Sequence, residues 1–197
     1  VGERLISRYL WGLRSRLLDY VLLTHPHADH IQGFPFVRRV FPIGRLFYFE
    51  FPDPDGRVLR RRLVAGDRFW VAGVEHSVLH PARESTWDTT NNPLVVLLRY
   101  GNFTLLLTGD IENPAEQKLL PQLGPVTVLK VAHHGANTSN SRAFLEKTQP
   151  RLALISAGRR NRFGHPSVET LERLEKARVT TLATPDWAPS GLKRTDW

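Results

Sequence analysis

Four potential metal ligands lie within six consecutive residues near the start of the chain: His25, His27, Asp29 and His30. They directly follow the mostly apolar run 17–23, which predicts a buried strand that ends in a tight turn. The turn can present alternate side chains to one side, so that His25 and His27 bind one ion while Asp29 and His30 bind a second. Imidazole and carboxylate together suit zinc, manganese or iron. Two ions ~3.5–4 Å apart can stabilise both the attacking and the leaving oxygen of a hydrolysis.

Asp110 is a further candidate ligand, and it follows the apolar run 103–107. Gly109 lets the backbone come close, so a carboxylate at this position could bridge two ions. The alternative is an ordinary turn aspartate. The pair His133 and His134 ends another apolar run. Each of these groups therefore lies in a loop that directly follows a predicted strand.

The elements that position these residues follow from periodicity and turn signals. Apolar residues recur at helical spacing in much of 1–16. Short apolar runs bounded by turn residues predict strands, and the turn 100–102 predicts a hairpin. The predicted strands are 18–24, 45–49, 69–71, 75–80, 94–98, 103–107, 126–131 and 152–156; the predicted helices lie within 1–16, from 30 to about 40, and at 112–120, 141–148 and 168–177. This alternation indicates an α/β fold, with residues 1–197 as a single domain.

The motif H-x-H-x-D-H after an apolar strand resembles the metallo-β-lactamase superfamily. Within it, four segments resemble the soluble domain of the ComEC family of bacterial DNA-uptake channel proteins: 22–30, 106–110, 129–135 and 164–166. The resemblance covers nearly the whole chain and implies a metallo-β-lactamase-like αββα sandwich of two mixed sheets. That family begins with strands carrying a D-V-G-Q-G-D-like sequence and closes with a last strand, so the sandwich is expected to be incomplete at both chain ends.

The resemblance also implies roles for single residues. His165 becomes the last metal ligand, beside Asp29 and His30. A histidine in the position of His133 or His134 assists the leaving oxygen as an acid, and His134 is the better candidate to face the site. The expected catalytic residues are Asp29 and His134, and the expected metal ligands are His25, His27, Asp29, His30, Asp110 and His165.

The first metal site lacks one expected ligand. Most superfamily members have another histidine between the first motif and the aspartate. His80, Asn92 or a water molecule could complete the site here, and His80 fits better as a structural histidine. His76 is expected to be an ordinary surface residue. An oxygen-rich, weaker site would suit Mn²⁺ better than tightly bound zinc.

The chain is strongly basic, with 27 Lys and Arg against 19 Asp and Glu, a formal charge of +8 and a pI near 10.4. This charge favours polyanionic partners or anionic membranes, although a merely solubilising surface is the alternative. Three arginines just before His165 are expected to hold a nucleic-acid backbone: Arg159, Arg160 and Arg162. The run 57–62 could contact phosphate or face solvent. Because cysteine is absent, thiolate zinc sites, disulfides and a cysteine nucleophile are excluded.

Together these observations predict a nuclease with two divalent ions, Mn or Zn, and no organic cofactor. The resemblance implies that it cleaves phosphodiester bonds of DNA and degrades one strand during uptake in natural transformation. Its expected partners are single-stranded DNA and the membrane channel portion of the same longer protein, on the extracytoplasmic side of a bacterial membrane. Two alternatives stay open: a non-catalytic DNA guide, and a small-molecule metallohydrolase such as a lactonase, which fits the motif but not the charge.

Overall fold

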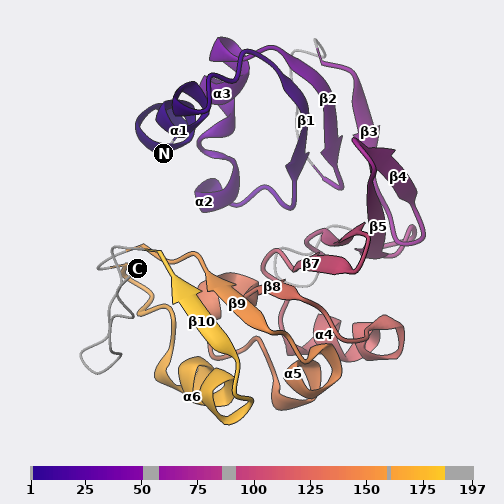
Figure 1. Ribbon diagram of the computed structural model, residues 1–197, viewed down its shortest axis with the longest axis vertical. Helices are drawn as coiled ribbons and strands as arrows, with labels where there is room; N and C mark the ends of the chain where they lie inside the picture. The colour runs from indigo at the N-terminus through magenta and orange to yellow at the C-terminus, as the bar shows by residue number, and fades with distance from the viewer. Residues whose placement is uncertain (1, 51–57, 86–91, 159–160, 185–197) are drawn as a thin grey trace.

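The computed structural model describes residues 2–50, 58–85, 92–158 and 161–184. These residues form two sheets with helices on the outside (Figure 1). The smaller sheet has the strand order β1-β2-β3 and is parallel; the larger has the order β10-β9-β8-β7-β6-β5-β4. The strands are β1 Leu18–Leu23, β2 Ile43–Tyr48, β3 Arg60–Arg62, β4 Arg68–Val71, β5 Val74–His80, β6 Val95–Tyr100, β7 Phe103–Leu107, β8 Val128–Lys130, β9 Leu152–Ile155 and β10 Thr180–Ala183.

The larger sheet changes direction at β7. Strands β4 to β7 are antiparallel neighbours, whereas β7, β8, β9 and β10 run parallel. The carboxyl ends of β7, β8 and β9 therefore reach the same edge of the sheet. The loops that carry Asp110, His134 and Ser156 leave the sheet at this edge, so the topology brings three distant segments together.

Helices cover the outer faces of the two sheets (Figure 1). A π-helical segment Gly2–Ile6 with α1 Ser7–Gly12, α2 Ala28–Ile31 and α3 Phe34–Val40 lie with the small sheet, and α4 Asn113–Leu119, α5 Arg142–Thr148 and α6 Val168–Lys176 cover the large sheet; 3₁₀ turns span Leu120–Gln122 and Ala132–Gly135. Ser141 and Ser167 cap α5 and α6, since each hydroxyl accepts a hydrogen bond from a backbone N–H of the first turn.

Buried apolar residues form separate clusters on the two sides of the large sheet. On its outer side, Leu106 and Leu129 pack in one cluster with Leu119, Phe144 and Leu174 from the three covering helices. On its inner side, a second cluster joins the two sheets and contains Phe47, Phe49, Leu63, Val64, Phe69, Val78, Leu94 and Val96. The layers are thus helix, sheet, sheet and helix, which confirms the α/β αββα sandwich.

The N-terminal helix differs from the prediction. It ends at Gly12, and the apolar residues Leu5, Tyr9 and Leu13 are 66%, 68% and 60% exposed. The physical reason is a close backbone approach on the opposite side, because a Cβ on Gly2 would lie 2.3 Å from the carbonyl oxygen of Gly33. The apolar stripe is therefore divided: Ile6 approaches Gly33 and Leu10 is half-buried, whereas Leu5, Tyr9 and Leu13 face out.

The expectation for His76 was wrong, because this residue is 1% exposed. Its Nδ1 donates to the carbonyl of Val74 at 3.1 Å, so its Nε2 can accept from the hydroxyl of Tyr20 at 2.7 Å. Its ring also stacks on Phe69. His76 is thus a structural histidine that links β5 to β1.

All eight predicted strands have a counterpart, whereas β3 and β10 were not predicted; β3 lies in the basic run 57–62. The R-T-D segment at 194–196 lies outside the described residues. In the described part of the chain, no helix is both long and apolar enough to cross a bilayer.

Candidate metal centre

The turn after β1 holds four of the expected ligands close together. His25 is buried, and the centre of its ring lies 4.7 Å from that of His27 and 4.0 Å from that of His30. Helix α2 begins at Ala28, so the backbone coils back and His30 returns toward His25. The hydroxyl of Thr24 lies 2.9 Å from Nδ1 of His25 and 3.5 Å from Nδ1 of His30. Because Thr24 occupies the Nδ1 atoms, the Nε2 atoms of both rings face the centre.

Asp110 is the residue on which the ligands converge. It is 2% exposed, and its Oδ2 lies 3.0 Å from Nε2 of His30 and 3.5 Å from Nε2 of both His25 and His134. Gly109 precedes it at φ +54°, where an added Cβ would lie 2.8 Å from the Pro93 side chain. Only glycine therefore allows the chain to bring Asp110 this close.

His134 reaches the centre from the turn after β8. Both His133 and His134 have left-handed backbone conformations, with φ of +49° and +54°. Nδ1 of His134 donates to the carbonyl of Ser156 at 2.6 Å. Its Nε2 lies 3.1 Å from Oδ2 of Asp29 and 3.1 Å from Nε2 of His30. The Ser156 carbonyl thus fixes the tautomer in which Nε2 offers a lone pair to the centre.

These side chains form two groups that could each hold a metal ion. One contains His25, His27 and Asp110; the other contains Asp29, His30, Asp110 and His134. Within each group the ligand atoms lie within 4.8 Å of one another. Asp110 belongs to both groups, as expected for a bridging carboxylate.

The chemistry of the centre fits a cation. Nε2 of His25 and Oδ1 of Asp110 are buried, and neither has a hydrogen-bond partner among the described residues. Burial lowers the pKa of His25. Burial also opposes ionisation of Asp110, but its contacts with His25 and His30 outweigh this effect and hold the pKa of the carboxyl far below its usual range. A neutral imidazole and an ionised carboxylate are the protonation states that metal ions require.

His165 lies outside both groups, although the sequence prediction placed it with Asp29 and His30. The centre of its ring is 5.6 Å from that of His133 and 5.8 Å from that of Phe163. Its backbone is held by Asn161, whose side chain accepts from the N–H and donates to the carbonyl of His165. The structure brings His134 to Asp29 and His30 instead, because the left-handed turn directs this ring inward.

His80 lies outside the two groups and is 7% exposed at the end of β5. A role for Asn92 in completing the first site stays a prediction. The guanidinium of Arg162 lies 4.7 Å from the ring centre of Phe163, close to His165. Arg159 and Arg160 lie outside the described residues. Sequence reasoning missed Thr24, although its position directly before His25 was a visible signal.

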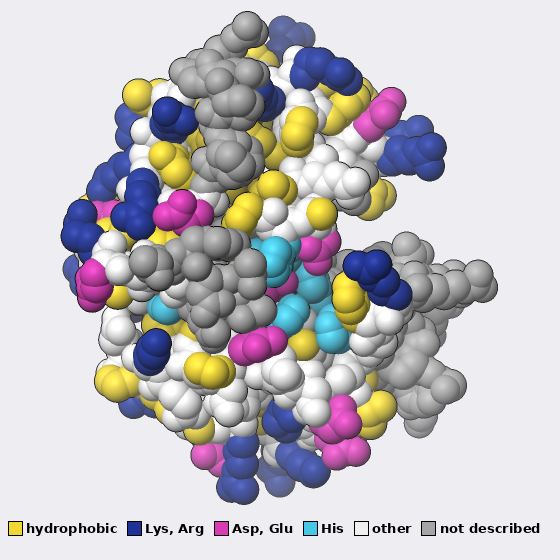
Figure 2. All heavy atoms as spheres, turned by 180° about the vertical axis from the view of Figure 1, so that it is seen from behind, with side chains coloured by type: hydrophobic (Ala, Val, Ile, Leu, Met, Phe, Trp, Pro, Cys, Tyr) yellow, Lys and Arg dark blue, Asp and Glu magenta, His cyan; other side chains and the backbone are white. Residues whose placement is uncertain are grey.

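The histidines gather where the two halves of the molecule meet. Figure 2 shows them in the middle of one face, beside acidic groups and next to a hollow between the halves. The centre is therefore open to an incoming molecule on this side, while His25 and Asp110 are buried beneath the surface.

Comparisons with known proteins agree with this geometry. The chain is 29% identical over 198 residues to ComE operon protein 3 of Bacillus subtilis (strain 168), covering 93% of this chain and 26% of that protein. It is 30% identical over 172 residues to competence protein ComA of Neisseria gonorrhoeae, covering 86% of this chain and 24% of that protein. The chain therefore spans about a quarter of the length of these relatives (26% and 24%).

A solved structure shares the fold. The metallo-beta-lactamase fold protein YhfI from Bacillus subtilis matches with a TM-score of 0.62 at 9% identity, over 93% of this chain and 82% of that chain. A family model described as the metallo-beta-lactamase superfamily matches residues 2–159. The chain belongs to the metallo-β-lactamase superfamily.

Proposed function

We propose that this chain is a metal-dependent phosphodiesterase that cleaves DNA with two divalent ions, Mn or Zn. The observation that carries the proposal is the buried Asp110, which is common to both ligand groups. Two ions held at such groups can stabilise the attacking and the leaving oxygen of a phosphodiester. The first group offers two imidazoles and one carboxylate in the described residues, a donor set that suits zinc as well as Mn²⁺.

The side chains at the metal centre have two roles: some are ligands, and others lie next to the ligands. Because His134 donates to Ser156 and directs Nε2 at Asp29, we assign it as a ligand of the second ion rather than as an acid. Asp29 is the most exposed ligand of that group, with its side chain 56% exposed, and lies at the mouth of the centre. His133 and His165 lie next to the centre without joining it, where they can donate hydrogen bonds to a phosphate.

Charge and similarity support DNA as the substrate. The formal charge is +8, and the guanidinium of Arg162 lies over the ring of Phe163, which stacks with that of His165. Arginine binds phosphate through paired hydrogen bonds, so a role for Arg159, Arg160 and Arg162 in holding the strand stays a prediction. The similarity to a competence protein and to a ComE operon protein supports single-stranded DNA taken up by a cell, with a membrane channel portion of the longer protein as partner, on the extracytoplasmic side.

The test is cleavage of single-stranded DNA by the purified chain with limiting Mn²⁺. Asp110→Ala should lower the rate by orders of magnitude, because one change removes a ligand from both groups. Circular dichroism should show an intact fold. Asp19→Ala, an exposed aspartate on β1, is the matched control and should keep the wild-type rate.

Two results would contradict the proposal. One is near-normal cleavage by Asp110→Ala at limiting metal, which would exclude a bridging role. The other is tight DNA binding with no cleavage in any divalent metal, which would favour the non-catalytic guide. Turnover of a lactone or β-lactam, with none of DNA, would instead favour the small-molecule hydrolase.

A further inference from the structure

The loop 136–141 is held by three buried or half-buried polar side chains that belong to neither ligand group. Asn140 and Glu116 are 0% exposed, and Arg173 is half-buried on α6. A buried carboxylate and a buried amide are costly unless their hydrogen bonds are satisfied. The geometry around Ala132 shows what these side chains hold in place.

Asn140 replaces a missing strand partner for the residue before the histidine pair. The hydrogen bonds between β8 and β9 end with the N–H of Val131, which donates to Leu154. Ala132 comes next, and the side chain of Asn140 accepts from its N–H at 2.9 Å and donates to its carbonyl at 3.0 Å. Asn140 itself has φ +57°. The amide therefore continues the strand's hydrogen bonding up to His133.

This support matters because the next two residues are strained. His133 and His134 have φ of +49° and +54°, a region that costs a non-glycine residue free energy. Without an external constraint the turn would relax toward ordinary backbone angles. Relaxation would swing Nε2 of His134 away from Asp29, from which it is 3.1 Å distant.

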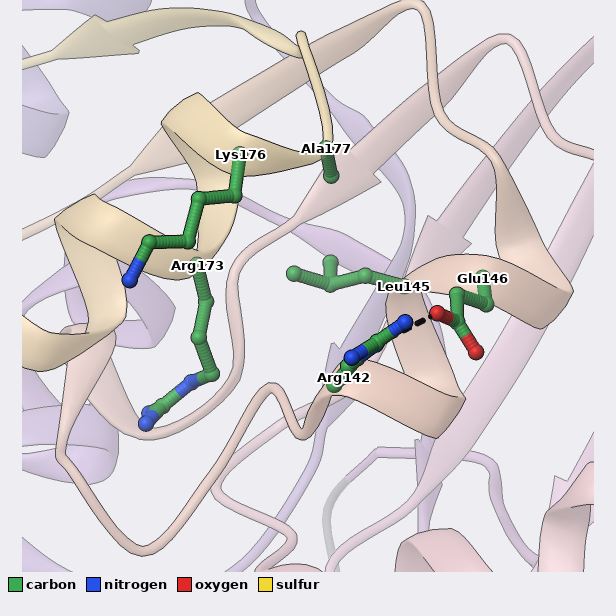
Figure 3. Close-up of a pocket in the computed structure, with 6 residues that line it drawn as sticks. All are labelled: Arg142, Leu145, Glu146, Arg173, Lys176 and Ala177. Carbon is green, nitrogen blue, oxygen red and sulfur yellow. Dashed lines mark hydrogen bonds and ion pairs between the residues drawn. The ribbon is translucent and has the colours of Figure 1, made fainter.

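Glu116 and Arg173 hold Asn140 from opposite sides. The carboxylate of Glu116, on α4, accepts from the backbone N–H groups of Asn140 and Ser141. Arg173 donates to the backbone carbonyls of Asn137, Ser139 and Asn140 at 3.0, 2.9 and 3.0 Å. Figure 3 shows Arg173 extending from α6 toward this loop, at the side of a cavity of about 380 Å³ between α5 and α6.

The same loop also reaches the segment that carries Asp110. The hydroxyl of Ser139 donates to the carbonyl of Ile111 at 2.8 Å, and the N–H of Asn113 donates to the carbonyl of Thr138 at 2.9 Å. One loop therefore contacts the neighbours of both Asp110 and His134.

We propose that Asn140 is a positioning residue of the second metal site: through Ala132 it holds His134 against Asp29 and Asp110, so that its loss removes the second ion and spares the first. This inference rests on the metal centre of the proposed function. It does not depend on the substrate. Changes to partners that orient ligands typically weaken metal affinity by ~10–100-fold.

The experiment counts bound Mn²⁺ per chain and measures each affinity by titration, with electron paramagnetic resonance to detect coupling between two ions. Asn140→Gly tolerates φ +57° and removes only the side chain, so it is the test variant. We expect wild type to bind two coupled ions. Asn140→Gly should bind one at wild-type affinity and the second about 10–100-fold more weakly, with the coupled signal lost.

Two control variants separate a role in positioning His134 from a general loss of fold stability. Asn161→Gly removes an equivalent amide clamp from His165 and should keep both ions. Ser141→Ala removes the cap of α5 beside Asn140 and should lower the melting temperature without changing metal content. If Asn140→Gly does not fold, Arg173→Lys loosens the same loop, with room in the adjacent cavity, and should weaken only the second ion.

Retention of two ions at wild-type affinity in Asn140→Gly or Arg173→Lys would overturn the inference, as would equal loss of both ions. Loss of the second ion in Asn161→Gly would also overturn it, because His165 would then be the ligand. A wild-type chain that binds only one ion has no second site for Asn140 to position. Two coupled ions without DNA cleavage would defeat the proposed function and leave this inference standing.

Discussion

The two segments that supply most of the proposed ligands are built in different ways. The turn 24–30 carries four proposed ligands, and its support is the hydroxyl of Thr24 and the short helix α2. The segment 132–141 carries one proposed ligand, His134, and is held by a buried network through Asn140, Glu116 and Arg173. Ligands that are neighbours in sequence are positioned largely by their own spacing. A single ligand on a strained turn depends on the surrounding fold.

The largest effect that tests this comparison is the removal of the single ligand. His134→Ala should abolish binding of the second ion and lower DNA cleavage by at least about 100-fold, because the proposed chemistry needs both ions. His165→Ala should keep both ions, since its ring lies outside the ligand groups. Metal analysis of both variants is the measurement. The opposite pattern would restore His165 as the ligand and break the comparison.

An intermediate effect is expected in the turn. Thr24→Val removes the hydroxyl that contacts Nδ1 of His25 and His30 while keeping the side-chain shape. Because the four ligands remain, metal affinity should fall by roughly tenfold, the lower end of the range for such partners. Calorimetric titration of Thr24→Val beside Asn140→Gly measures the difference. A larger loss in the turn variant than in the loop variant would show that the turn is the more dependent segment.

The smallest effect expected is on the pH dependence of stability, through His76, which links β5 to β1. Burial lowers the pKa of His76, so the folded chain binds fewer protons at this residue than the unfolded chain. Stability from this group is complete above the ordinary histidine pKa of 6.5 and falls as pH drops from there through the lower folded-state pKa. Urea midpoints of the metal-free chain at pH 7.5 and 5.5 should differ less in His76→Gln than in wild type. An unchanged difference would mean that other histidines carry the dependence.

Much of the first ligand segment could be predicted from the sequence. The ligands of the turn lie next to each other, and β1 shows as an apolar run directly before them. Asp110 could also be predicted from the sequence as a ligand, since Gly109 and an apolar strand precede it. His76 could have been found as well, because it shares one face of β5 with Val78 and His80, and all three are buried. Its polar character concealed this pattern.

The choice between His134 and His165 could not be made from the sequence. It depends on two left-handed residues and on the pair of hydrogen bonds between the Asn140 amide and the backbone of Ala132, and neither leaves a periodic signal. The inward side of the N-terminal helix was hidden for a related reason. The close approach of the Gly2 and Gly33 backbones turns Leu5, Tyr9 and Leu13 outward, although they share their helical spacing with the inward Ile6 and Leu10.

The distances along the chain between the ligands bear on the time course of folding. His30 and Asp110 are 80 residues apart, and His30 and His134 are 104 apart. Contacts between such remote positions form slowly, because long loops must close before the contacts stabilise them. We therefore expect a newly made chain to offer His25 and His27 to a metal ion early, and to complete the centre only when both sheets have docked.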